Sequence, residues 1–206
     1  MMRSFRELPR RFYEPSAMVV APALLGHWLI RNTPNGLCGG AIVETEAYLA
    51  GDPACHGAPG PTARNRVMFG EPGHAYVYFI YGNHYCMNVV CRPSGMAEAV
   101  LIRAVEPEFG VEILRANRAG RPDVELTNGP GKLCAALEID RKLDGADLCD
   151  AGAPLLIARH PQARRFRKLR GPIVTATRVG ITKAADLPLR FYLEASSWVS
   201  RRMAGE

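Results

Sequence analysis

The chain has 206 residues, of which 48% are hydrophobic and 22% are charged, so its composition excludes a disordered or low-complexity protein. The length suits one domain with a sizeable core. The 26 lysines and arginines outnumber the 20 acidic residues, which gives a net charge of +6. This balance favours a polyanion such as nucleic acid as a partner, although an arginine-rich codon usage would produce the same balance.

The N-terminal region and the cysteines exclude further classes of protein. Residues 1–16 are polar and arginine-rich, and the apolar run after them is interrupted by Pro22 and His27. We therefore expect neither a membrane span nor a signal peptide. None of the six cysteines belongs to a C-x-x-C pair, so we expect buried free thiols rather than disulfides or a zinc site.

The first third of the chain predicts a helix, two strands and a long loop. Ser16 is a suitable N-cap for the helix and Gly26 a suitable end, with Pro22 in the middle. Asn35 and Gly36 mark a turn between the two strands. The loop is rich in glycine and proline, and loops of this length are usually functional or disordered. The expected elements are a helix over 16–26, strands over 27–32 and 38–48, and a loop over 50–73.

The rest of the chain begins with its clearest motif, a β-hairpin. Tyrosine, valine, phenylalanine and isoleucine dominate both arms, and Gly82-Asn83 lies at the turn. The expected elements are hairpin arms over 74–81 and 84–91, a strand over 98–105, helices over 107–120 and 129–139, a solvated loop at 164–170 and a strand over 187–200. These elements predict a mixed α/β (α+β) fold.

Two acids in the strand over 38–48 are the first candidates for chemistry. The two-residue period puts Glu44, Glu46 and Tyr48 on one face, with the acids roughly 6.6 Å apart. A solvated sheet face is one interpretation, and a carboxylate pair that cleaves O-glycosides is another. Because both acids point the same way, we favour one as a general base for water and the other as a structural support. Arg103, a charge in an apolar strand, needs a partner, and Glu46 is the natural one.

Aromatic side chains near these acids suit an extruded nucleobase. Tyr48, Tyr78 and His56 could supply stacking faces, while Tyr81 lies beside the hairpin turn, where it could enter a duplex. Core packing is the better interpretation for Val77 and Phe79. Arg64 and Arg66, in the long loop, suit phosphate contacts, with help from Thr62 and backbone amides.

The order of the motifs identifies a family. The chain contains, in sequence, "IVETEAY", a histidine in a polar loop, "RNR-MF--PGH-YVY-IYG", "CMN", "LIRA-EP", "NGPGKLC-AL" and "RVGI". From about Phe12 to Ser200 it closely resembles the alkyladenine (3-methyladenine) DNA glycosylases of the vertebrate-type, non-helix-hairpin-helix fold. The resemblance implies a single domain over 1–206 with a curved, mostly antiparallel sheet, a protruding hairpin and surrounding helices. Residues 1–11 would be an N-terminal arm and residues 200–206 a C-terminal tail.

The resemblance also implies an activity and its partners. Such enzymes flip alkylated or deaminated purines out of duplex DNA, a class that includes 3-methyladenine, 7-methylguanine, hypoxanthine and ethenoadenine. An activated water then hydrolyses the N-glycosidic bond and leaves an abasic site, with no lyase step, metal or cofactor. We expect a monomer that binds damaged double-stranded DNA, in a bacterial cytoplasm and near the nucleoid, with no membrane contact.

Roles follow for residues that match the motifs. Glu46 would be the general base, and Arg103 and the Val179 carbonyl would hold the water. Tyr81 would fill the vacated space in the duplex. The base pocket would comprise Tyr48, His56, Tyr78 and Asn88, and the DNA backbone would contact Thr62, Arg64 and Lys132.

Three features depart from the family pattern, and one alternative function stays open. The loop over 50–63 is shorter and richer in proline and glycine than the family pattern. Asn83 and His84 occupy the hairpin tip, where bulkier side chains are expected, and the basic run at 164–170 lies outside the motifs. A catalytically silent binder of damaged DNA is the alternative. A zinc deaminase is excluded because the H-x-E and P-C-x-x-C signatures are missing from the sequence.

Overall fold

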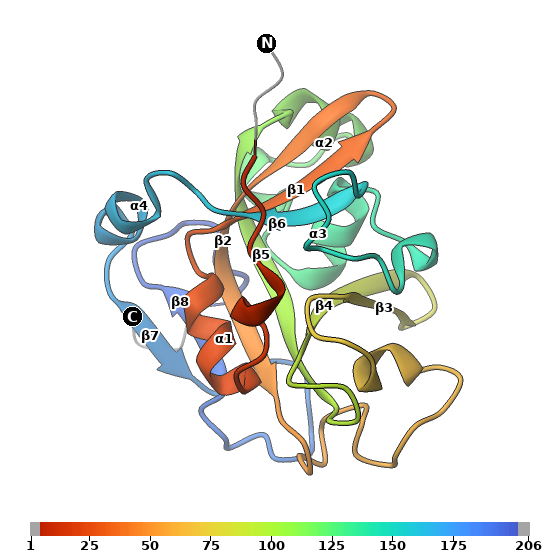
Figure 1. The fold of residues 1–206 in the computed structure, drawn as a ribbon. Coiled ribbons are helices and arrows are strands. Elements are labelled where there is room, and N and C mark those ends of the chain that lie inside the picture. The colour runs from red at the N-terminus through yellow and green to blue at the C-terminus, as the bar shows by residue number, and fades with distance from the viewer. Residues whose placement is uncertain (1–4, 202–206) are drawn as a thin grey trace.

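The computed structural model describes residues 5–201, and its centre is a curved, antiparallel β-sheet (Figure 1). Eight strands lie within this range, and six of them follow the order β3-β4-β5-β2-β1-β6. Strand β8 pairs with β2, and β7 pairs with β8. The strands are β1 (Trp28–Thr33), β2 (Gly36–Tyr48), β3 (Ala75–Ile80), β4 (His84–Cys91), β5 (Glu98–Phe109), β6 (Leu155–Ala158), β7 (Ile173–Ala176) and β8 (Arg190–Leu193). The helices are α1 (Ala17–Leu24), α2 (Val111–Asn117), α3 (Pro130–Ala136) and α4 (Ala163–Leu169).

The two longest strands, β2 and β5, form the spine of the sheet. Their register shifts near Gly39 and again between Ile42 and Thr45, and such bulges bend a strand and re-aim its side chains. Gly40 is required at the first irregularity, because a Cβ there would lie 1.9 Å from the carbonyl oxygen of Glu106. The mixed α/β fold with a curved antiparallel sheet is therefore confirmed.

Helix α1 begins after the predicted N-cap, Ser16, and ends two residues before Gly26, the predicted end. The Ser16 hydroxyl accepts a hydrogen bond from the Met18 amide and donates one to Glu98, 2.8 Å away. Pro22 lies inside the helix, which ends only two residues later at Leu24, so the missing backbone donor disturbs little. The buried face of α1 joins the main core, which also contains side chains of β2, β5 and α3.

Three predicted elements are wrong. Pro107 does not open a helix; it pairs with Gly40 at the end of β5, and α2 starts only after Gly110 adopts a left-handed φ of 62°. The basic run at 164–170 is not a solvated loop, because residues 163–169 form α4. The strand expected over 187–200 is confined to β8, and β6 and β7 were not predicted at all.

Other predictions from the sequence are confirmed. Strands β3 and β4 form the expected hairpin, which protrudes at the right of Figure 1. All six cysteines are free, and five of them are buried. The long segment 50–73 contains one short 3-10 helix over Arg66–Phe69 and is otherwise loops and turns.

The chain ends are described in part. The segment expected to be an N-terminal arm packs from residue 5 onward: Leu8 is fully buried, and its amide donates to the Ile157 carbonyl at 2.9 Å. Residues 202–206 of the expected tail lie outside the described residues. Between residues 5 and 201, no helix is long and apolar enough to cross a membrane.

Candidate active site

Two adjoining cavities lie between the β3–β4 hairpin, the end of β2 and the loop that contains residues 179–183. The first has a volume of about 450 Å³ and the second about 560 Å³. Both are lined by Pro53, Ala54, His56, Tyr76 and Lys183. The first is large enough to hold a purine and is mostly aromatic and apolar, which is the usual character of a small-molecule site.

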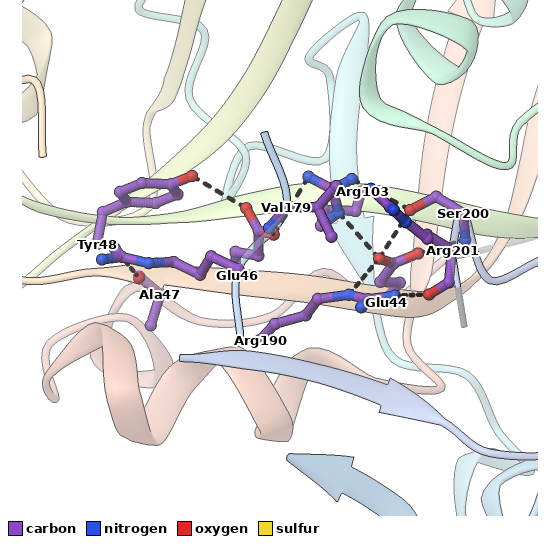
Figure 2. Close-up of polar contacts among 10 residues, drawn as sticks. Glu44, Glu46, Ala47, Tyr48, Arg103, Val179, Arg190, Ser200 and Arg201 are labelled. Atoms are coloured by element: carbon purple, nitrogen blue, oxygen red, sulfur yellow. Dashed lines mark hydrogen bonds and ion pairs between the residues drawn. The ribbon is translucent and has the colours of Figure 1, made fainter. Parts of the chain in front are cut away.

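Glu46 lies directly behind the wall of the first cavity, because it is fully buried and residues that bind it line that cavity. Figure 2 shows the polar contacts of Glu46 and Glu44. Its carboxylate accepts hydrogen bonds from the Tyr48 hydroxyl at 2.9 Å and from the Val179 amide at 2.7 Å. The Arg103 guanidinium forms an ion pair with it at 3.3 Å, as the sequence predicts. All three partners line the cavity although Glu46 is fully buried. The contact from Val179 is through its N–H, whereas the expected role involved its carbonyl.

Glu44 has a different environment, at the centre of a buried polar cluster. Its oxygens accept from Arg103 Nε at 2.9 Å and Arg190 Nε at 2.8 Å, and from the Ser200 amide and hydroxyl at 2.6 and 2.8 Å. Thr45, between the two acids, bonds to the Ala21 carbonyl of α1, so Glu44 and Glu46 share the opposite face. Arg103 therefore bridges the two carboxylates, and Arg190 balances the second negative charge.

The protonation states of these groups follow from their surroundings. Burial alone would lower the pKa of Arg103, but Glu46 and Glu44 raise it above its ordinary value. Burial raises the pKa of Tyr48 far above its usual range, and the neighbouring Glu46 charge raises it further. Tyr48 is therefore a neutral hydrogen-bond donor, and the guanidinium and phenol together fix the Glu46 carboxylate.

Three aromatic side chains form one wall of the cavity. The ring centroids of His56 and Tyr78 are 4.5 Å apart, those of Tyr76 and Tyr78 are 5.4 Å apart, and His56 Nδ1 lies 3.0 Å from the Tyr76 hydroxyl. Burial, and then the charge of Arg64, lowers the pKa of His56, which favours an uncharged ring near neutral pH. Tyr48 lines the same cavity from β2.

Tyr76 was missing from the predicted pocket, although its two-residue spacing from Tyr78 on β3 was available as a signal. Burial raises its pKa to about 12, so the phenol stays neutral. Asn88 of β4 is paired with Tyr76 across the hairpin, lines the cavity and donates to the Tyr76 carbonyl at 3.3 Å.

The hairpin tip presents Tyr81 to solvent. Tyr81 is 74% exposed with a left-handed φ of 54°, and it lines the cavity mouth. Phe79 was expected in the core, but it is 46% exposed, because its end of β3 extends beyond the rest of the sheet. Arg64 reaches the Phe79 carbonyl at 3.3 Å and lines the second cavity with Thr62. Lys132, on α3, donates to the Asn128 side chain at 2.9 Å.

An ion pair that sequence analysis missed holds the loop that carries Val179. The buried side chain of Arg178 bonds to Asp52, and it donates to the Ala47 carbonyl at 3.1 Å and the Ala184 carbonyl at 3.2 Å. Its guanidinium carbon lies 4.7 Å from the centre of the Tyr48 ring. Arg178 thus touches Tyr48 and adjoins Val179, the two hydrogen-bond donors to Glu46. No local pattern joins positions 52 and 178.

Comparison with known proteins identifies the family of the chain. A sequence model of the family described as "Methylpurine-DNA glycosylase (MPG)" matches residues 11–197. Proteins from Carboxydothermus hydrogenoformans and Methanoculleus marisnigri are 49% and 50% identical to the chain, in each case over 95% of the chain and 99% of the relative. One from Mesorhizobium japonicum is 49% identical over 88% of the chain and 84% of its own length.

All three relatives are named "Putative 3-methyladenine DNA glycosylase". The family match covers the two acids of β2, the hairpin and the loop that carries Val179. The chain therefore belongs to the methylpurine-DNA glycosylase family of DNA-repair enzymes, which hydrolyse N-glycosyl bonds.

Proposed function

We propose that the protein is a monofunctional glycosylase that removes alkylated purines, and also hypoxanthine and ethenoadenine, from duplex DNA. The observation that carries the proposal is the position of Glu46 directly behind an aromatic cavity, held by Tyr48, Val179 and Arg103. Each of these partners fixes the carboxylate at the cavity wall. A carboxylate so placed suits a base that activates one water molecule.

The cavity binds the flipped purine by stacking. A purine alkylated at N3 or N7 carries a positive charge, so Tyr48, Tyr78 and the uncharged His56 ring attract it by cation–π contacts. Tyr81 enters the duplex in place of the extruded nucleotide, at a cost of a few kcal/mol that is smallest for damaged or mispaired bases. Asn88 lies at the edge of the flipped base and opposes a 2-amino group. Guanine and 7-methylguanine both carry this group, and the cation–π contacts of the charged 7-methylguanine offset the clash.

The reaction changes the charge on both the base and the sugar. The N-glycosidic bond breaks, its electron pair stays on the purine, and a cationic purine leaves as a neutral base. The positive charge that develops at C1′ is stabilised by the Glu46 carboxylate, which then accepts a proton from the water that attacks C1′. Arg103 holds the carboxylate in place through their ion pair. Thr62, Arg64 and Lys132 bind the phosphates on either side, and the enzyme acts as a monomer.

One observation favours a second candidate, a glycosylase with lyase activity. Lys183 is exposed and lines both cavities, and a lysine amine that attacks C1′ would form a Schiff base and cleave the strand. We favour the monofunctional reaction because Glu46 needs no lysine to activate water. Borohydride, which traps a Schiff base covalently, separates the two candidates.

In the experiment, a duplex that contains one 7-methylguanine is incubated with the purified protein. The product is then divided, and one half is kept neutral while the other is treated with alkali. A monofunctional glycosylase releases the free base and gives strand breaks only after alkali, with no borohydride-trapped complex. Breaks at neutral pH with trapping would assign the lyase reaction. If the protein binds the duplex and releases no base, it is a silent binder and the proposal is wrong.

A further inference from the structure

The positive charge of the chain is concentrated in one segment. Residues 159–170 contain six of the 26 lysines and arginines and none of the 20 acidic residues. The remaining residues therefore contain 20 cations and 20 acids, which cancel, so these 12 residues account for the whole net charge of +6. The basic patch consists of Arg159, Arg164, Arg165, Arg167, Lys168 and Arg170, on and beside α4.

Most of this charge faces solvent without a counterion. Within residues 5–201, Arg170 alone in the basic patch forms an ion pair with a carboxylate, that of Glu106. Arg159, Arg164, Arg165 and Lys168 are exposed. Phe166, on the inner side of α4, packs against the main core, so the helix is held at a fixed orientation. Unpaired cations on a rigid element form a preorganised surface for an anion.

Charges of the basic patch help to lower the pKa of a neighbouring histidine, His27. The pKa of His27 falls from its ordinary value of 6.5 to about 4, through burial first and then through the charges of Arg167, Arg159 and His160. His27 precedes β1, and Gly26 beside it lies against the stem of Arg167. The charges of Arg167 and Arg159 thus add to an effect that burial dominates, which agrees with their closeness to His27.

The basic patch lies far from the first cavity, which is called the lesion cavity below because it would hold the flipped purine. Arg170 bonds to Glu106, which pairs with Ala41 on β2, whereas Tyr48 at the cavity is seven residues further along the same strand. Seven residues of strand span roughly 23 Å, about the width of a duplex. Figure 1 shows α4 at the left margin of the molecule and the β3–β4 hairpin at the right.

We propose that the basic patch on α4 is a second DNA-binding surface, which holds the phosphate backbone of a duplex segment other than the one at the lesion cavity. Arginine is the major cation of the patch, and its planar fork of donors matches phosphate oxygens. Duplex DNA carries one negative charge for about every 1.7 Å of axis, so a helix of seven residues, roughly 10 Å long, spans several charges. An enzyme with two such surfaces transfers between DNA segments without full release.

The test fills the lesion cavity first. The protein is saturated with a short duplex that carries a stable abasic-site analogue, with about one helical turn on each side, and is then titrated with a labelled undamaged duplex. Sedimentation and fluorescence anisotropy report whether both duplexes occupy one protein. We expect a ternary complex whose second binding step weakens with salt.

The variant Arg164→Gln/Lys168→Gln removes two exposed cations four residues apart on α4. The log–log salt slope of the second step should fall by about 1.8, which is two phosphate contacts at about 0.9 each, and single-turnover excision at saturating protein should not change. The control Arg121→Gln/Lys142→Gln removes one arginine and one lysine from exposed positions outside the basic patch.

The outcomes are distinct. A strict one-to-one complex in the wild type, or equal losses in the variant and the control, would overturn the proposal. Binding of the wild type to anionic phospholipid vesicles in place of the second duplex would assign the patch to a membrane surface and also overturn it. These measurements need no base release, so a failure of the glycosylase reaction would appear separately.

Discussion

Glu44 and Glu46 are two residues apart on one strand, yet their different surroundings indicate different roles. Glu44 is fully buried and accepts four hydrogen bonds from Arg103, Arg190 and Ser200. Glu46 receives its contacts from groups that line the cavity. Arg103 links the two acids, so a change at Glu44 reaches the reaction only through the position of that arginine.

We expect Glu44→Gln to be mainly a stability variant. Its neutral amide leaves two buried guanidinium groups without a full counter-charge, and breaking a buried ion pair typically costs about 3–5 kcal/mol. Thermal melting should show a large loss, while single-turnover excision below the melting temperature falls only modestly. An unchanged melting temperature with abolished excision would mean that Glu44 is the general base.

Arg178 gives a second prediction for a single residue. We expect Arg178→Met to loosen Val179 and Tyr48 together, and a displacement of about 1 Å in a reacting group can lower a rate roughly 100-fold. The maximal single-turnover rate should fall while affinity for lesion DNA changes little. The separate variant Asp52→Asn keeps a hydrogen-bond acceptor for Arg178, so its single-turnover rate should fall less than that of Arg178→Met. Equal losses of affinity and rate would contradict a positioning role.

At the scale of elements, the β3–β4 hairpin carries the residue that we expect to enter DNA. Tyr81→Ala removes an exposed ring from the tip without touching the core. Single-turnover excision from a fully paired duplex should fall sharply, whereas excision from a mismatched or bulged site should fall less, because extrusion there is already easy. Equal losses on the two substrates would show that Tyr81 has no part in extrusion.

Elements with a strong local period could be predicted from the sequence, and elements set by distant contacts could not. Alternating apolar side chains specified β3 and β4, and capping specified α1. Strands β6 and β7 have only four residues each, too few to show a period. The charges of α4 suggested a solvated loop, although arginine, lysine, leucine and alanine are all good helix formers.

The same limit applies to the candidate site. The two-residue period singled out Glu46 and Tyr48, and its position in an apolar strand singled out Arg103. The structure brings the three together. The ion pair of Asp52 with Arg178 joins residues 126 positions apart, so only the folded chain reveals it. Pairing across the hairpin was also needed to see that Asn88 lies beside Tyr76.

At the scale of the whole molecule, His27 makes stability depend on pH. Between pH 6.5 and about 4 the unfolded chain takes up a proton that the folded chain does not. The unfolded state then binds more protons, so the free energy of unfolding falls as the pH falls through this window. Melting temperatures from pH 7 to pH 4 should show this decline, and His27→Leu should reduce its slope. A slope that His27→Leu leaves unchanged would contradict the assignment.

The account rests on Glu46 as the group that activates water, and Glu46→Gln tests it most directly. The amide preserves the shape of the side chain and removes both the base and the negative charge opposite C1′. Loss of a general base typically lowers a rate by about 10²–10⁴-fold, and the lost charge stabilisation adds to this. Binding to lesion DNA should persist or improve, because an anion near phosphates is gone.

The deciding measurement is therefore single-turnover release of 7-methylguanine by wild type and Glu46→Gln, with the protein in saturating excess and below the melting temperature of both. The account predicts a loss of at least about 100-fold in the rate with lesion binding retained. Equal rates for the two proteins would contradict it.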